Sequence, residues 1–163
     1  MTTTRSRSAQ ALGLVVCVLA CFAAGALGAI ASVDAPTFYA ELEKPSFAPP
    51  ASVFGPVWTA LYTAMAVAVW SVWRAPQRRA RALPLFAAQL AVNALWSWLF
   101  FAWHLGAAAF AEILLLVVLV AWTALEFRRS SRLAAALLLP YLAWVAFAAV
   151  LTWTLWRANP GLL

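Results

Sequence analysis

Five long apolar stretches, separated by short polar segments, dominate the hydrophobic pattern of the chain. A helix needs about 20 mainly apolar residues to cross the ~30 Å hydrocarbon core of a bilayer, since it rises ~1.5 Å per residue. The five stretches reach about this length, and they lie at residues 12–30, 53–73, 83–103, 107–125 and 133–156. The pattern predicts an all-α integral membrane protein, a single domain over residues 1–163 built as a five-transmembrane-helix bundle.

The basic residues are divided unevenly between the two faces that this threading creates. Lys44 and Arg157 lie on one face, and the opposite face carries Arg5, Arg7, Arg74, Arg78, Arg79, Arg81, Arg128, Arg129 and Arg132. Because Lys and Arg collect in cytoplasmic loops, we expect the N-terminus in the cytoplasm of a bacterial cell and the C-terminus outside it. This topology accounts for the net charge of +6, so we expect no nucleic-acid partner.

Composition excludes a water-soluble globule, because a chain that is 66% hydrophobic and 10% charged cannot cover its surface with polar groups. The first stretch also has the features of a signal peptide, with Arg5 and Arg7 before it and a small-residue step at 29–31. Its apolar run is longer than that of a usual signal peptide, so we expect it to be retained as a span.

Few residues in the chain suggest metal or nucleophile chemistry. His104 is the only histidine, and no carboxylate cluster adjoins it in the sequence. Cys17 and Cys21 are one helical turn apart in the first stretch, where we expect them to pack as small apolar side chains. We therefore predict neither a metal site nor an obligatory cofactor.

The loop at residues 31–52 is longer than the others and contains several prolines and aromatic residues. Prolines restrict the unfolded loop, and aromatic side chains give it apolar surface to bury. We predict a structured lid that includes Tyr39, Phe47, Pro49 and Pro50.

Nine of the ten tryptophans fall into two groups. Six fit an interfacial belt at or near the ends of the stretches, namely Trp70, Trp73, Trp103, Trp122, Trp153 and Trp156. Trp58, Trp96 and Trp144 lie further inside the predicted spans and are candidates for an internal site.

Helical spacing places polar and aromatic neighbours beside these three tryptophans. Trp58 and Tyr62 are one turn apart and form a first stripe along one helix face. A second stripe contains Gln89, Asn93 and Trp96. A third contains Tyr141, Trp144, Ala148 and Thr152. The stripes have two interpretations: interhelical hydrogen bonds with core packing, or a cavity for a flat, mainly apolar ligand. Glu112 adds an intramembrane acid, either a functional group or a side chain that reaches interfacial water.

Four segments resemble the motifs of the translocator protein family, which is also called the tryptophan-rich sensory protein (TspO/MBR) or peripheral benzodiazepine receptor family. They occur in order along the chain at residues 44–50, 54–62, 89–96 and 140–148. The resemblance implies a homodimeric five-helix membrane protein that binds porphyrins, haem, sterols and drug-like molecules under the first loop. The implied ligand-binding positions are Tyr39, Trp58, Tyr62, Asn93, Trp96, Trp144 and Ala148.

The chain also departs from the family pattern. Phe47 stands where a Trp is usual, whereas Glu112 stands where relatives often carry an acid. The sterol-response pattern is incomplete at Val150, Trp153 and Arg157, so cholesterol dependence is not expected.

Three functions remain open at this point. The first is a tetrapyrrole-binding protein in porphyrin transport or stress signalling. The second is a light-dependent porphyrin-degrading enzyme with Trp58 and Trp144 as redox-active candidates, and the third is a membrane interaction scaffold.

Overall fold

The computed structural model describes residues 6–76 and 80–163, and helices make up most of this part of the chain. Five helices are long and apolar enough to cross a membrane. They are α1 (Arg7–Ala31), α3 (Phe54–Trp73), α4 (Ala82–Ser97), α5 (Gly106–Arg128) and α6 (Arg132–Ala158). The predicted all-α bundle is therefore confirmed.

The long helices α1 and α6 begin at serine caps that lie outside the apolar stretches. The Ala9 N–H donates to Ser6 Oγ over 3.2 Å, and the Ala134 N–H donates to Ser131 Oγ over the same distance. Such bonds satisfy amide groups that have no partner inside the helix. As a result α1 begins five residues before the predicted stretch.

The third span ends in a widened π-helical segment, η2 (Trp98–Ala102), which continues directly from α4. The Trp103 N–H donates to the Trp98 carbonyl over 2.9 Å, which is the five-residue spacing of a π turn. His104 follows with a φ of 52° and reverses the chain into α5.

The predicted lid contains two short helical segments, α2 (Ala35–Glu41) and the 3₁₀ turn η1 (Ala51–Val53). Pro36 lies in the first turn of α2, where its missing N–H costs no helical hydrogen bond. Phe38, Tyr39 and Leu42 are buried, so this segment packs onto the bundle through its apolar side chains.

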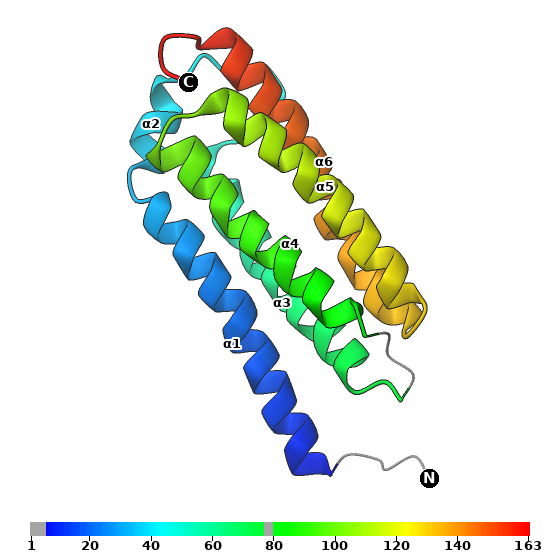
Figure 1. Cartoon of the computed structure of the whole chain (residues 1–163). Coiled ribbons are helices and arrows are strands. Elements are labelled where there is room, and N and C mark those ends of the chain that lie inside the picture. Colours follow the sequence, from blue (N-terminus) through cyan, green and yellow to red (C-terminus); the bar gives the residue numbers. More distant parts are fainter. Residues whose placement is uncertain (1–5, 77–79) are drawn as a thin grey trace.

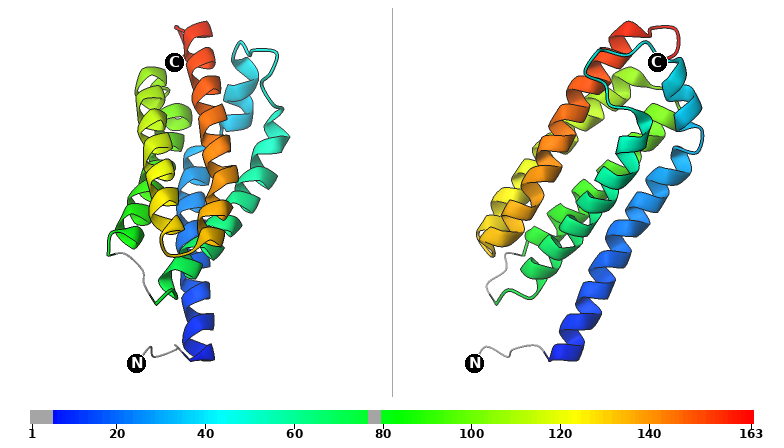
Figure 2. Two further views of the ribbon diagram at one scale, coloured as in Figure 1. Left: turned by 90° about the vertical axis from the view of Figure 1, so that its right-hand side faces the viewer. Right: turned by 180° about the vertical axis from the view of Figure 1, so that it is seen from behind.

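The helices form a bundle in which α5 and α6 are the most extensively packed pair, and α1 lies at an outer edge against α3 and α4 (Figures 1 and 2). The lid, the turn from η2 to α5 and the C-terminus lie together at one end of the bundle (Figure 1). The first described residues of α1 lie at the opposite end.

The two ends of the bundle differ in charge as the sequence predicts. Lys44 and Arg157 belong to the lid end, and the opposite end carries Arg7, Arg74, Arg81, Arg128, Arg129 and Arg132. Arg5, Arg78 and Arg79 lie outside the described residues.

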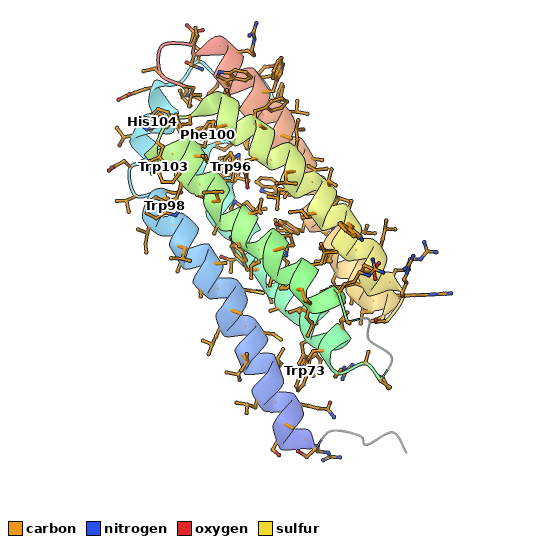
Figure 3. All side chains as sticks on the ribbon, in the orientation of Figure 1. Trp73, Trp96, Trp98, Phe100, Trp103 and His104 are labelled. Atoms are coloured by element: carbon orange, nitrogen blue, oxygen red, sulfur yellow. The ribbon has the colours of Figure 1, made fainter. Side chains whose placement is uncertain are left out.

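Two predicted belt tryptophans have packing roles at the end remote from the lid. The Trp70 indole N–H donates to the Gln10 carbonyl over 2.9 Å. Trp73 covers Gly13 so closely that an added methyl group there would lie 2.4 Å from the indole ring (Figure 3). These contacts fasten the start of α1 to the end of α3.

Candidate functional site

A cavity of about 530 Å³ lies beneath the lid, bounded by α1 and by the lid-end halves of the other four spans. All seven residues predicted to bind a ligand line it: Tyr39, Trp58, Tyr62, Asn93, Trp96, Trp144 and Ala148. None of the described residues in its wall is charged. Four elements, α2, α3, α4 and α6, thus place the predicted positions around one apolar space.

Aromatic rings from α3 and α6 form one wall of the cavity. Trp58 stacks on Tyr62 with 5.4 Å between ring centroids, and its edge approaches Tyr141 at 6.2 Å. Phe54 meets Trp144 edge to face at 5.9 Å. These contacts hold the indoles in fixed orientations, as a site for a planar ligand requires.

Two hydrogen bonds across the helices fix the polar side chains of α4. The Tyr62 hydroxyl donates to Asn93 Oδ1 over 2.7 Å, and the Tyr141 hydroxyl donates to Gln89 Oε1 over 2.9 Å. Asn93 lines the cavity, whereas Gln89 does not. Gln89 therefore serves only to link two helices by a hydrogen bond. Asn93 forms such a link and also borders the cavity.

Trp96 is held on α4 by two phenylalanines of the π segment. Its ring stacks on Phe100 at 5.1 Å with an interplanar angle of 10°, and Phe101 meets it at 90°. Figure 3 shows Trp96 and Phe100 on this span, with His104 beyond them beside the lid. Trp96 Nε1 is buried and has no hydrogen-bond partner among the described residues, which leaves one donor in the site unused.

The lid closes the cavity chiefly through Tyr39. Its hydroxyl donates to the Pro49 carbonyl over 3.0 Å, and its ring meets Phe54 edge to face at 5.7 Å. Burial raises the pKa of the Tyr39 phenol above its usual value of 10.0, so the phenol keeps its proton at neutral pH.

The other predicted lid residues lie outside the cavity wall. Phe47 is exposed and meets Phe147 at 6.2 Å, whereas Pro49 and Pro50 border a second, shallower hollow over α2. They shape the lid but do not line the cavity.

Glu112 also lies outside the cavity wall, although its neighbour Ile113 is part of it. The side chain is buried at 9% exposure, and within the part of the chain that the structure describes neither carboxylate oxygen has a hydrogen-bond partner. It therefore does not reach water at the helix end, which was one of the two expectations from the sequence.

Sequence periodicity missed several residues of the wall: Gly25 and Gly28 of α1, Phe101 of η2, and Ile113 and Leu116 of α5. The small residues of α1 did carry a signal, because Ala20, Ala24 and Gly28 recur every fourth position. Ala24 and Gly28 are buried as that spacing predicts, but Ala20 is exposed. The sequence of α5 and of the π turn has no comparable pattern that would predict which of their residues face the cavity.

An apolar, aromatic cavity enclosed by membrane-spanning helices and covered by a lid defines a membrane protein of the receptor type. Residues 17–157 match the TspO/MBR family. The chain belongs to this family and is an integral membrane protein.

Individual relatives cover most of the chain. The tryptophan-rich protein TspO of Chlorobaculum tepidum is 38% identical over 156 residues, which is 93% of this chain and 98% of the relative. The translocator protein of Ovis aries is 40% identical over 128 residues, 76% of each chain. The protein CrtK of Rhodobacter capsulatus is 36% identical over 146 residues, 88% of this chain and 90% of the relative.

Proposed function

We propose that this protein binds tetrapyrroles such as protoporphyrin IX or haem, and other flat hydrophobic or sterol-like molecules, in the cavity beneath the lid. Its role would be porphyrin transport or stress signalling. The observation that carries the proposal is the convergence of Trp58, Trp96 and Trp144 with Asn93 on one uncharged space. Its volume of about 530 Å³ lies within the usual range for small-molecule sites.

The names of the relatives are consistent with such a role. One is called a translocator protein, and another, from Cereibacter sphaeroides, a tryptophan-rich sensory protein. The family resemblance also leads us to propose a homodimer, which light scattering of the purified protein would test.

Substitutions in the cavity wall test the proposed binding. Trp144→Ala removes stacking area, and Asn93→Ala removes a polar partner and leaves the Tyr62 hydroxyl unpaired. Each change should weaken protoporphyrin binding by about 1–3 kcal/mol. The porphyrin absorbance shift is the suitable readout, because it does not depend on the tryptophans of the protein.

Trp122→Ala is the matched control. Trp122 lies on α5 and is 46% exposed, so its loss should leave the affinity unchanged. Equal losses at Trp122 and Trp144 would indicate partition into detergent or lipid. That result would favour an interaction scaffold without a dedicated ligand site.

Light-dependent oxidation of the bound porphyrin, with dissolved dioxygen as the electron acceptor, is a second candidate function, favoured by the contact of the Trp58 indole with two tyrosines. Indole and phenol rings in contact can share an oxidised state, whereas phenylalanine cannot take part. Trp58→Phe and Trp144→Phe should retain most of the affinity, since buried apolar area contributes ~25 cal/mol per Å². A protein-dependent photoproduct that disappears in these variants would establish an enzymatic function. Bleaching of the porphyrin no faster than in an empty micelle would favour a binding protein.

A further inference from the structure

The lid is fastened to the bundle at several points. The side chain of Asn159, just after α6, accepts from the Glu43 N–H over 2.8 Å and donates to the Glu43 carbonyl over 3.0 Å. Phe38 of α2 stacks on His104 at 4.1 Å. Lifting the lid would break these contacts together.

The lid is also stiffened internally by Lys44. Its ammonium group donates to the carbonyls of Tyr39, Ala40 and Leu42 over 2.7, 3.1 and 2.8 Å. These carbonyls lie at the C-terminal end of α2, where they have no partner within the helix. The cation therefore stabilises the closed form of the segment.

The wall between α1 and α3 is much less strongly closed. These helices meet at Gly25, where an added methyl group would lie 2.7 Å from the Tyr62 ring. Between Gly25 and the lid, α1 packs against α4 instead, where Gly28 lies against Ser97. Within the described residues, no hydrogen bond or ring contact joins 26–31 of α1 to 51–59 of the facing segment.

Residues on both sides of this gap line the cavity and are also exposed. On α1 they are Ala26 and Ala29, and on α3 they are Gly55 and Thr59. A methyl group added at Gly55 would meet no atom within 4 Å, so the space beside it is open. The cavity therefore has a mouth on its side.

We propose that ligands enter and leave through this lateral mouth directly from the surrounding lipid leaflet, while the lid stays closed. The proposal rests on the proposed function, since it concerns access to the same cavity. Ala26 and Thr59 are each five residues from the lid-side helix ends, or ~7.5 Å at ~1.5 Å per residue. The mouth thus opens at the level where lipid headgroups meet acyl chains.

This position identifies the chemical class of the ligand as a planar amphiphile that already resides in the membrane. The cavity wall offers no charged side chain to neutralise a carboxylate. Burying such a group there without a partner would be costly. The ring system would enter between Trp58 and Trp144, and its acidic groups would stay at the mouth in headgroup water.

Steric obstruction of the mouth tests the route. Gly55→Phe, or independently Ala29→Phe from the opposite rim, should slow both association and dissociation of protoporphyrin in liposomes. The expected reduction is about tenfold or more, because a steric barrier of ~1.4 kcal/mol at the mouth already has that effect. Ala60→Phe is the matched control, since Ala60 is exposed on α3 but does not line the cavity.

Loosening the lid gives the opposite test. Asn159→Ala removes both side-chain bonds to Glu43 and should leave the exchange rates unchanged. If Asn159→Ala accelerates exchange while the two Phe variants behave as the unaltered protein, entry is through the lid and the lateral route is wrong. Failure of the unaltered protein to bind protoporphyrin would instead refute the proposed function.

A spin label at the mouth tests the lateral opening without any ligand. In a Cys17→Ala, Cys21→Ala background, a nitroxide on Thr59→Cys should collide more with apolar oxygen than with a water-soluble nickel chelate in liposomes. The reverse order would mean that the mouth faces water, which would overturn entry from the lipid.

Discussion

Asn93 and Gln89 are one helical turn apart on α4, yet the structure gives them different surroundings. Both amides accept a hydrogen bond from a tyrosine of another helix. Only Asn93 borders the cavity, whereas Gln89 lies in the packed core. Spacing in the sequence predicts that the two side chains share a face, but the width of the space in front of them depends on other helices.

The hydroxyl of Tyr39 gives a residue-scale prediction about the lid. Tyr39→Phe removes the bond to the Pro49 carbonyl, which is worth about 1 kcal/mol. Amides of residues 43–53 should then exchange with solvent about fivefold faster at neutral pH, as mass spectrometry would measure. An unchanged rate of amide exchange would mean that the other contacts of the lid are enough to hold it closed.

The same residue predicts a pH dependence. Burial raises the pKa of the folded-state phenol above 10.0, so its stabilising bond is fully present below pH 10. That contribution is lost as the pH rises through the raised pKa, because a phenolate cannot donate a hydrogen bond. Phenolate absorbance should show a component that titrates above pH 10 and is missing in Tyr39→Phe. Titration at or below pH 10 would contradict the burial argument.

At the scale of elements, hydrophobic periodicity predicts the five spans but not the irregular pieces between them. Long apolar runs determine helices such as α5 and α6, and their bounds differ from the prediction by only a few residues. The seven residues of α2 are too few to give a reliable period, and the π turn at Trp98–Ala102 depends on a local shift of the backbone hydrogen bonds. Both irregular pieces lie at the lid end, and Phe101 of the π turn reaches the cavity wall.

Beside the cavity, the approach of α1 to α3 depends on Gly25. A side chain at Gly25 would strike the ring of Tyr62, whose hydroxyl is bonded to Asn93. Gly25→Val should therefore destabilise the bundle by about 1–3 kcal/mol, as overpacking does, and weaken porphyrin binding as well. Thermal unfolding in detergent measures the first effect. Ala23→Val, at an exposed position of the same helix, is the control, and equal melting temperatures for the two variants would refute a close α1–α3 contact.

For the whole molecule, the odd number of spans and the unequal charge together predict how the protein lies in the membrane. If all five candidate spans cross, the two chain ends lie on opposite sides. Six described arginines, Arg7 among them, mark the end remote from the lid, and only Lys44 and Arg157 belong to the lid end. The cavity and its lateral mouth are thereby assigned to the leaflet opposite the basic loops.

This arrangement predicts that a reporter fused after Leu163 is extracytoplasmic and one inserted in the loop between Arg74 and Ala82 is cytoplasmic. The physical reason is the retention of Arg-rich short loops on the cytoplasmic side during insertion, which acts on both basic loops in the same direction. Exchanging Arg128 and Arg129 for Gln should weaken the bias without changing the number of spans, and exchanging the exposed lid residues Thr37 and Ser46 for Gln is the uncharged control. A cytoplasmic reading at Leu163 would reverse the orientation, and the proposed ligand mouth would then open to the cytoplasmic leaflet.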